Sequence, residues 1–146
     1  MDEVKTNSKQ FVIFSLEGEE YGIEILRVKE IKEMIRITRV PKAPHYVRGV
    51  INLSGEVIPI VDLRKKFNLE KRNDNDNTRI IIVAVEEITV GLVVDTSSEV
   101  IGIMIKDIEE APETVGSFEQ GFISGIGKVG SRLIILLNVD KILINN

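Results

Sequence analysis

Branching at the Cβ atom dominates the apolar part of this sequence and is the feature that most restricts its fold. The chain holds 23 Ile and 17 Val against only 3 Ala among 146 residues. Branched side chains lose rotamer freedom in a helix and pack well on the pleated surface of a strand. The apolar residues also occur in short runs, the longest from Ile80 to Val85, which suits strands of ordinary length. The sequence therefore predicts a mainly β fold with a few short helices.

Turn residues such as Ser54-Gly55 separate the apolar runs and predict hairpins. The polar run from Glu70 to Thr78 contains no apolar residue and predicts a loop or a boundary. A histidine-bearing segment with two prolines, residues 41–46, interrupts the strands. The expected strands are residues 11–16 with 20–23, 47–53 with 56–63, 79–85 with 88–94, then 99–105, and 122–126 with 131–137; the expected helices are a short one from Val28 that runs into a strand at 35–40, a helical turn at 64–69 and a closing helix at 138–144.

The two halves of the chain are similar to each other. Residues 11–14 match residues 80–83 at an offset of 69 positions, and residues 57–63 match residues 133–139 at an offset of 76. Two β-rich halves also align by chance, which is the alternative reading. The repeat predicts two β subdomains, at residues 10–69 and 79–146, that follow a flexible N-terminus at residues 1–9 and together form one domain.

Each predicted subdomain has only about 70 residues, which is marginal for an independent core. We therefore expect the two subdomains to pack on a shared apolar seam. The C-terminal segment is a candidate to pack back on the first subdomain. A seam of this kind forms a groove in which a partner can lie.

The residue inventory argues against catalysis and against metal or cofactor binding. The chain has no Cys, which excludes disulfides, thiolate metal sites and thiol nucleophiles. His45 is the single histidine, and its turn-like surroundings predict a surface residue rather than a catalyst. The sequence motif at residues 125–130 has the glycine spacing of a dinucleotide site, but a strand-like segment follows it, so it predicts a hairpin turn. Asp74 to Thr78 lacks the glycine and glutamate of a calcium loop and is expected to be a solvated linker.

Charge and hydropathy bear on the possible partners. The 19 Lys and Arg against 23 Asp and Glu leave a net charge of −4, which argues against a general binder of nucleic acid. The polar residues 1–9 do not resemble a signal peptide, and no apolar run is long enough to span a bilayer. We therefore expect a cytoplasmic protein without direct membrane insertion. The strands predicted at residues 47–53 and 56–63 offer apolar side chains and backbone groups to a partner, so a binding module is favoured over an enzyme.

Two sequence blocks carry a family resemblance. E-Y-G-I at residues 20–23, continued to Ile31, and R-G-V-I-N-L at residues 48–53, continued to Arg64, resemble the CheW family of bacterial chemotaxis coupling proteins, with further matches at residues 90–95 and 132–138. The resemblance covers essentially everything after Lys9. It implies two SH3-like five-stranded β-barrel subdomains. It also implies a non-catalytic scaffold, recruited to membrane receptor arrays, that couples the cytoplasmic tip of chemoreceptors to the regulatory domain of the histidine kinase CheA.

The alternative from the residues alone is a small β-barrel that binds a ligand or a nucleic acid. For the coupling function, the resemblance implies two sets of contact residues. The family usually has Arg where this chain has Ser54, so that charged contact cannot be transferred, and Arg48 or Arg64 are candidates to replace it. The receptor-binding candidates are Val28, Glu30 and Gly49, with Ile31 added because it continues the apolar stripe of Val28; the kinase-binding candidates are Leu53, Ser54, Gly55 and Val57.

Overall fold

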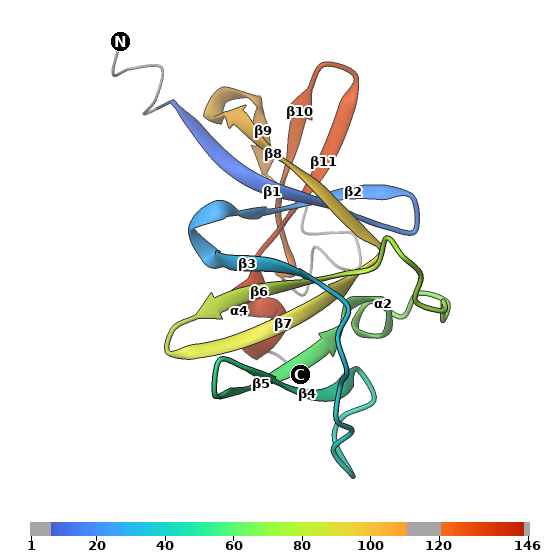
Figure 1. Cartoon of the computed structure of the whole chain (residues 1–146). Coiled ribbons are helices and arrows are strands. Elements are labelled where there is room, and N and C mark those ends of the chain that lie inside the picture. The colour runs from blue at the N-terminus through green and yellow to red at the C-terminus, as the bar shows by residue number, and fades with distance from the viewer. Residues whose placement is uncertain (1–6, 111–120, 145–146) are drawn as a thin grey trace. The chain divides into compact units, whose positions relative to one another are not determined.

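The computed structural model describes residues 7–110 and 121–144 (Figure 1). Within these residues the chain is mainly β, with two short α-helices and two single turns of 3-10 helix. The predicted fold class is therefore confirmed. The elements are β1 (Ser8–Leu16), β2 (Glu19–Glu24), η1 (Ile25–Arg27), β3 (Val28–Glu33), β4 (Val47–Leu53), β5 (Glu56–Asp62), α2 (Leu63–Lys66), β6 (Arg79–Val85), β7 (Ile88–Val94), β8 (Thr96–Met104), η2 (Ile105–Asp107), β9 (Ile108–Glu110), β10 (Ile123–Val129), β11 (Arg132–Leu137) and α4 (Val139–Ile144).

The strands form two sheets, and the chain divides into two compact units. Unit 2 consists of residues 15–17 and 27–97, and its five-stranded sheet has the order β3-β6-β7-β5-β4. The segment that follows β3 reaches the far edge strand, where Thr38 and Val50 exchange two backbone hydrogen bonds of 2.9 and 2.8 Å. This bridge joins the two edges of the sheet, as the closure of a small barrel requires.

Unit 1 consists of residues 1–14, 18–26 and 98–146, and its sheet has the order β8-β1-β2-β11-β10-β9. The sheet has six strands where the resemblance implied five. The difference arises at η2, which bends one run of chain into β8 and β9. Because β8 and β9 are consecutive in the chain and lie at the two ends of the sheet order, unit 1 closes in the same way as unit 2.

The internal repeat is visible in the strand pairing. Gly22 of β2 pairs in parallel with Leu136 of β11, and Gly91 of β7 pairs in parallel with Ile60 of β5. Gly22 and Gly91 are 69 positions apart and Ile60 and Leu136 are 76 apart, the two offsets of the sequence repeat. β-Bulges occur at Gly49 in β4 and at Gly125 in β10, again 76 positions apart. The β1–β2 and β10–β11 hairpins of unit 1 are therefore structurally equivalent to the β6–β7 and β4–β5 hairpins of unit 2.

The same equivalence extends to the short helices that follow β5 and β11. Asp62 and Asn138 each accept a hydrogen bond from the backbone N–H three residues later, at 3.3 and 3.2 Å. Both side chains cap a helix N-terminus, which stabilises a short helix by satisfying a free backbone donor. The closing helix predicted at residues 138–144 is confirmed as α4.

The boundaries of the two units differ from the predicted halves at residues 10–69 and 79–146. The hairpin of β1 and β2 belongs to the sheet that contains β10 and β11, whereas the hairpin of β6 and β7 belongs to the sheet that contains β4 and β5. The reason is that each parallel pair, β2 with β11 and β7 with β5, joins strands from different halves. The polar run from Glu70 to Thr78 is a loop within unit 2 and not a boundary. The seam between the subdomains stays a prediction.

Three local expectations also changed. The helix expected from Val28 is wrong, because residues 28–33 pair with β6 as strand β3. The strand expected at residues 35–40 is reduced to the single bridge at Thr38. Of the N-terminal residues expected to be flexible, residues 1–6 lie outside the described part of the chain, and β1 already begins at Ser8. Residues 111–120, between the strands expected at 99–105 and 122–126, lie outside the described residues.

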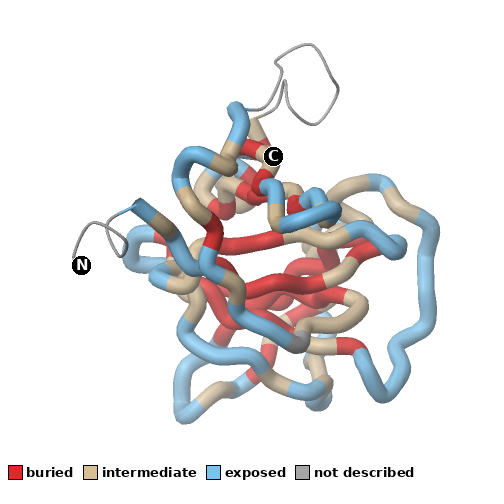
Figure 2. Tube along the Cα trace, turned by 90° about the horizontal axis from the view of Figure 1, so that it is seen from above, coloured by how far each residue is buried: buried red, intermediate tan, exposed pale blue. Residues whose placement is uncertain are grey.

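Each unit has its own core, in which branched side chains are buried. Figure 2 marks the buried stretches of the chain. In unit 2 the cluster is built around Ile80 and Ile82, both fully buried, with residues of β4 and β5. In unit 1 the cluster contains Phe11, Ile134 and Leu136. The Ile side chains that dominate the sequence therefore form much of the buried interior of the two units.

Candidate protein-binding site

All eight site residues expected from the sequence lie in unit 2. The receptor-binding candidates are on two strands, β3 and β4, and the kinase-binding candidates are at the turn between β4 and β5. β3 is an edge strand of the five-stranded sheet, so one of its sides has no partner in the sheet order. Edge strands are places where partners can dock. The elements carrying both sets are labelled in Figure 1.

A β-bulge arranges the receptor-binding candidates on β3. Val28 is opposite Val83, Glu30 is opposite Ile82 and Ile31 is opposite Ile81, with the register shift between the first two pairs. Val83 and Ile81 are two residues apart, so Val28 and Ile31 lie on one face of the sheet. A helical period would also place Val28 and Ile31 on one stripe, and the bulge produces the same grouping in a strand.

The exposure of these side chains differs. Ile31 is 40% exposed, Val28 is half-buried, and Glu30 is exposed on the other face, where its carboxylate lies 3.5 Å from Lys32 Nζ. The edge strand therefore offers a partner an exposed apolar side chain on one face, Ile31, and an exposed carboxylate on the other, Glu30.

Gly49 is buried at the bulge of β4 and has a φ of +146°. A Cβ atom at this position would lie 2.0 Å from the carbonyl oxygen of Thr38. The space left by the missing side chain is therefore used by this chain itself, at the bridge that closes unit 2. The role of Gly49 in receptor binding stays a prediction.

The turn between β4 and β5 is tightly defined. Ser54 and Gly55 have φ values of +52° and +84°, the pair of positive angles typical of a two-residue hairpin turn. The side-chain oxygen of Asn52 accepts a hydrogen bond of 2.9 Å from the Gly55 N–H. Leu53 packs against the core cluster of unit 2, whereas Val57 is 68% exposed. Of the four kinase-binding candidates, Val57 therefore offers the apolar surface and the others set the shape of the turn.

Both arginines suggested as replacements at Ser54 are held in ion pairs by this chain, and their role in kinase binding stays a prediction. Arg48 donates to Asp62 at 2.9 Å and to both carboxylate oxygens of Asp74 at 2.7 and 2.9 Å. Arg64 is buried and donates to both oxygens of Asp95 at 2.7 Å, and its guanidinium also lies 2.7 Å from Glu17. Both cations are therefore neutralised within unit 2.

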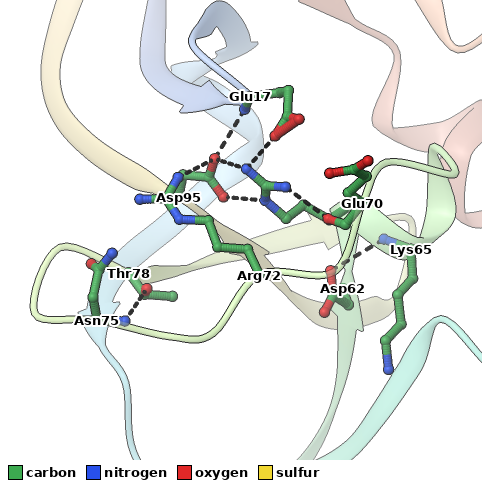
Figure 3. Close-up of polar contacts among 9 residues, drawn as sticks. Glu17, Asp62, Lys65, Glu70, Arg72, Asn75, Thr78 and Asp95 are labelled. Atoms are coloured by element: carbon green, nitrogen blue, oxygen red, sulfur yellow. Dashed lines mark hydrogen bonds and ion pairs between the residues drawn. The ribbon is translucent and has the colours of Figure 1, made fainter.

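Sequence reasoning missed the charged network around Asp95, which Figure 3 shows. Asp95 accepts from Arg64, from Arg72 at 3.0 Å and from the backbone N–H of Glu17 at 2.9 Å. Burial raises the pKa of Asp95, but the hydrogen bonds from Arg64 and Glu17 and the nearby positive charges outweigh it, so the pKa lies below its ordinary value of 3.8. The available signal was an aspartate placed directly after an apolar strand.

Other features of the described residues bear on function class. His45 is exposed and meets the ring of Tyr46 edge-on at a centroid distance of 5.5 Å, as expected for a turn residue. Across residues 7–110 and 121–144, no group of three His, Cys, Asp or Glu side chains is arranged to hold a metal ion. In the same part of the chain, no helix has the length and hydropathy needed to cross a membrane.

Comparison with known proteins gives a consistent result. The model of the CheW-like domain matches residues 10–145. Chemotaxis protein CheW of Bacillus subtilis is 40% identical over 97% of this chain and 90% of its own, and that of Helicobacter pylori is 42% identical over 92% and 81%. The solved structure of scaffolding protein TtCheW from Thermoanaerobacter tengcongensis has 38% identity and a TM-score of 0.88, and the match covers 94% of both chains. With its sequence and its fold matched over nearly their whole length, the chain belongs to the CheW-like domain family.

Proposed function

We propose that this chain is a non-catalytic, cytoplasmic scaffold of bacterial chemotaxis that is recruited to membrane receptor arrays and couples chemoreceptors to the histidine kinase CheA. The observation that carries the proposal is the likeness to a scaffolding protein across 94% of both chains, with a TM-score of 0.88. Relatives with the name chemotaxis protein CheW at 37–42% identity support the same process. These likenesses favour coupling over the alternative of a barrel that binds a ligand or a nucleic acid.

Two surfaces of unit 2 are proposed to bind the two partners. Val28, Glu30 and Ile31 on edge strand β3, together with Gly49, form the proposed receptor surface. The turn of Leu53, Ser54 and Gly55 with Val57 forms the proposed kinase surface. Support comes from the exposed apolar side chains that each surface presents, Ile31 at 40% and Val57 at 68% exposure. Exposed apolar residues that become desolvated on binding contribute most of the affinity of an interface.

The mechanism is thermodynamic. A scaffold that binds a receptor and a kinase at separate surfaces fixes their relative orientation. The kinase exchanges between an active and an inactive arrangement. A receptor state that binds one of these arrangements more tightly shifts the equilibrium toward it by the difference between the two binding free energies. Couplings of this kind typically amount to about 1–3 kcal/mol, so no chemistry within the scaffold is needed.

The proposal is tested by binding the whole chain to a receptor cytoplasmic fragment and, separately, to the kinase regulatory domain. Ile31→Asp is expected to weaken receptor binding about tenfold or more and to leave kinase binding within about twofold, because a charge replaces an apolar contact. Val57→Asp is expected to do the reverse. Ile88→Asp is the control, since Ile88 is similarly exposed at 58% in unit 2 but lies in neither surface.

The outcomes separate the function from the site assignment. If both partners bind the unaltered chain but each variant weakens both equally, with circular dichroism unchanged, the two surfaces are assigned wrongly. If neither partner binds the unaltered chain, the coupling function itself is wrong.

A further inference from the structure

We propose that unit 2 has a separate groove that binds an acidic, partly apolar peptide segment of a partner protein. The groove has a volume of about 910 Å³ and is lined by the segment between β3 and β4, by α2 and by the loop that follows α2. We call it the basic groove. None of the eight proposed receptor and kinase contacts lines it, so the inference goes beyond the coupling function and does not depend on it.

The charge of the groove points to an anionic occupant. Six Lys and Arg side chains and two Asp side chains line it, in a chain with a net charge of −4. Two of the cations are already neutralised, Arg48 by Asp62 and Asp74, and Arg72 by Asp95 at 3.0 Å. The other four, Arg39, Lys42, Lys65 and Lys71, have no ion pair within the described residues. Clefts lined by one sign of charge concentrate ligands of the opposite sign.

The position of Lys42 is unusual for its backbone. Its φ is +64°, directly after Pro41. The second central residue of such a turn is favoured to be Gly or Asn, because other side chains are strained in the left-handed region. Lys42 therefore places a positive charge in the lining of the groove although its backbone is strained. Strained backbone of this kind clusters at binding sites.

Lys65 is presented to the groove by a capped helix. Its backbone N–H donates to the carboxylate of Asp62 at 3.3 Å. Its side chain runs away from that carboxylate, and the Nζ atom ends clear of the groups drawn in Figure 3. The cap therefore holds the start of α2 in place without neutralising the lysine.

Apolar side chains line the groove beside the charged ones. Met34, Ile35, Val40 and Val47 line it, and Ile35 and Val40 are 38% and 43% exposed. Pro41 and Pro44 stiffen the segment. An occupant that fits both features carries carboxylates and at least one apolar side chain.

The arrangement favours a peptide over the other anions. The unpaired cations come from three separate segments, around residues 39–42, 65 and 71, which suits several carboxylates in a row better than one phosphate. A single-stranded nucleic acid needs aromatic stacking partners, and the lining contains His45 but no Phe, Tyr or Trp. The observations therefore select an acidic peptide.

The proposal is tested with a phage-displayed library of random heptapeptides. The library is selected on the full chain and depleted on the Lys42→Glu/Lys71→Glu variant, in which two exposed cations of the groove are reversed. We expect the selected peptides to be enriched in Asp and Glu and to contain an apolar residue. A fluorescein-labelled copy of the most enriched peptide, measured by anisotropy, is expected to bind the variant at least tenfold more weakly and to lose affinity as salt is raised.

The control variant is Lys106→Glu/Lys141→Glu, which changes the net charge equally at two exposed lysines of unit 1. It is expected to bind the peptide within about twofold of the unaltered chain. Circular dichroism establishes that both variants are folded, and Lys71→Gln replaces the double variant if it is not.

Several results would overturn the proposal. Selection of neutral or basic peptides, or no enrichment over the depleting variant, excludes an acidic peptide. Complete displacement of the labelled peptide by 10 mM inorganic phosphate, a concentration of the order used for weak ligands, indicates a small-anion site instead. Dimerisation of the unaltered chain in sedimentation, absent from the groove variant, identifies the occupant as a second copy.

Discussion

Gly49 illustrates how much a single residue contributes to unit 2. The place that a side chain would take at this position is occupied by the Thr38 carbonyl, at the bridge that closes the sheet. In addition, the backbone of Gly49 has a φ of +146°, a conformation that residues with a side chain rarely adopt. A substitution here therefore acts on the fold before it acts on any partner, and binding data on Gly49 variants need a stability measurement beside them.

Gly49→Ala is expected to lower the free energy of unfolding by about 2–4 kcal/mol, because backbone must shift and strain is added. Urea unfolding followed by circular dichroism measures this loss. Gly102→Ala is the control, since a Cβ at Gly102 meets nothing within 4 Å, and it is expected to change stability by less than about 0.5 kcal/mol. Equal effects of the two substitutions would contradict the role given to the Thr38 bridge.

Asp95 gives the stability of the chain a pH dependence. Its pKa in the folded chain lies below 3.8, because the hydrogen bonds from Arg64 and Glu17 and the adjacent positive charges outweigh the effect of burial. A carboxylate with a lowered folded pKa contributes stability that is fully present well above about pH 4 and is lost as the pH falls through the folded pKa.

Asp95→Asn is expected to cost about 2–3 kcal/mol at pH 7, somewhat less than a fully broken buried pair, because Arg64 keeps Glu17 as a partner. The difference from the unaltered chain should shrink as the pH falls below about 4. Urea unfolding at a series of pH values measures both effects. Asp76→Asn, an exposed loop position, serves as the control, and an Asp95→Asn loss that is independent of pH would refute this account.

At the scale of elements, the repeat supplies matched positions in the two parallel strand pairs. A Cβ at Gly91 would lie 2.6 Å from Ile60 Cδ1 and 2.8 Å from Ile80 Cγ2, whereas a Cβ at Gly22 would lie no closer than 3.2 Å to its neighbours, of which Leu136 is the nearest. The two glycines occupy equivalent places, but the branched side chains around Gly91 leave less room.

Gly91→Ala is therefore expected to destabilise the chain by about 1–3 kcal/mol, the range typical of an overpacked core. Gly22→Ala is expected to cost less than about 1 kcal/mol, since its neighbours need to move only a few tenths of an ångström. Chemical denaturation of both variants tests the order, and a larger loss of stability at Gly22 would mean that Gly22, and not Gly91, is the more tightly packed of the two positions.

β3 shows why element type is harder to predict than element position. The spacing of Val28, Ile31 and Ile35 fits a helical period, but the segment pairs with β6 along its length. Branched residues have weak helix propensity, and pairing with a neighbouring strand overrides a local preference. The bulge between Val28 and Glu30 then shifts the alternation by one residue, which disguises the strand in the sequence.

At the scale of the whole molecule, the strand pairing makes each half of the chain depend on the other. β2 of the first half pairs with β11 of the second, and β5 of the first pairs with β7 of the second. A fragment that ends in the loop from Glu70 to Thr78 therefore lacks β6 and β7 of the unit 2 sheet and β8 to β11 of the unit 1 sheet.

Fragments 1–73 and 74–146 are each expected to be unfolded alone, because neither contains a complete sheet, and to regain native structure when mixed in equal amounts. Dispersion of amide signals in NMR spectra of the separate and mixed fragments measures this. The uncut chain provides the reference spectrum. A well-dispersed spectrum from residues 74–146 alone would restore the division into two consecutive halves.

The sequence by itself determined the local elements: the hairpins of residues 47–53 with 56–63 and of 79–85 with 88–94 were predicted at nearly their observed bounds. Alternation and turn chemistry are properties of neighbouring residues, so they can be read without a fold. The family, and through it seven of the eight proposed contact residues, also came from short blocks of sequence, whereas Ile31 came from the apolar stripe that it continues with Val28.

Only the tertiary structure decided which hairpins share a sheet, how Asp95 is held by residues 31 and 78 positions away, and that cations from three segments line one groove. Each of these depends on contacts between residues that are distant in the chain. Similar apolar strands can pair in many combinations, and the combination that forms is selected by the packing of the complete core.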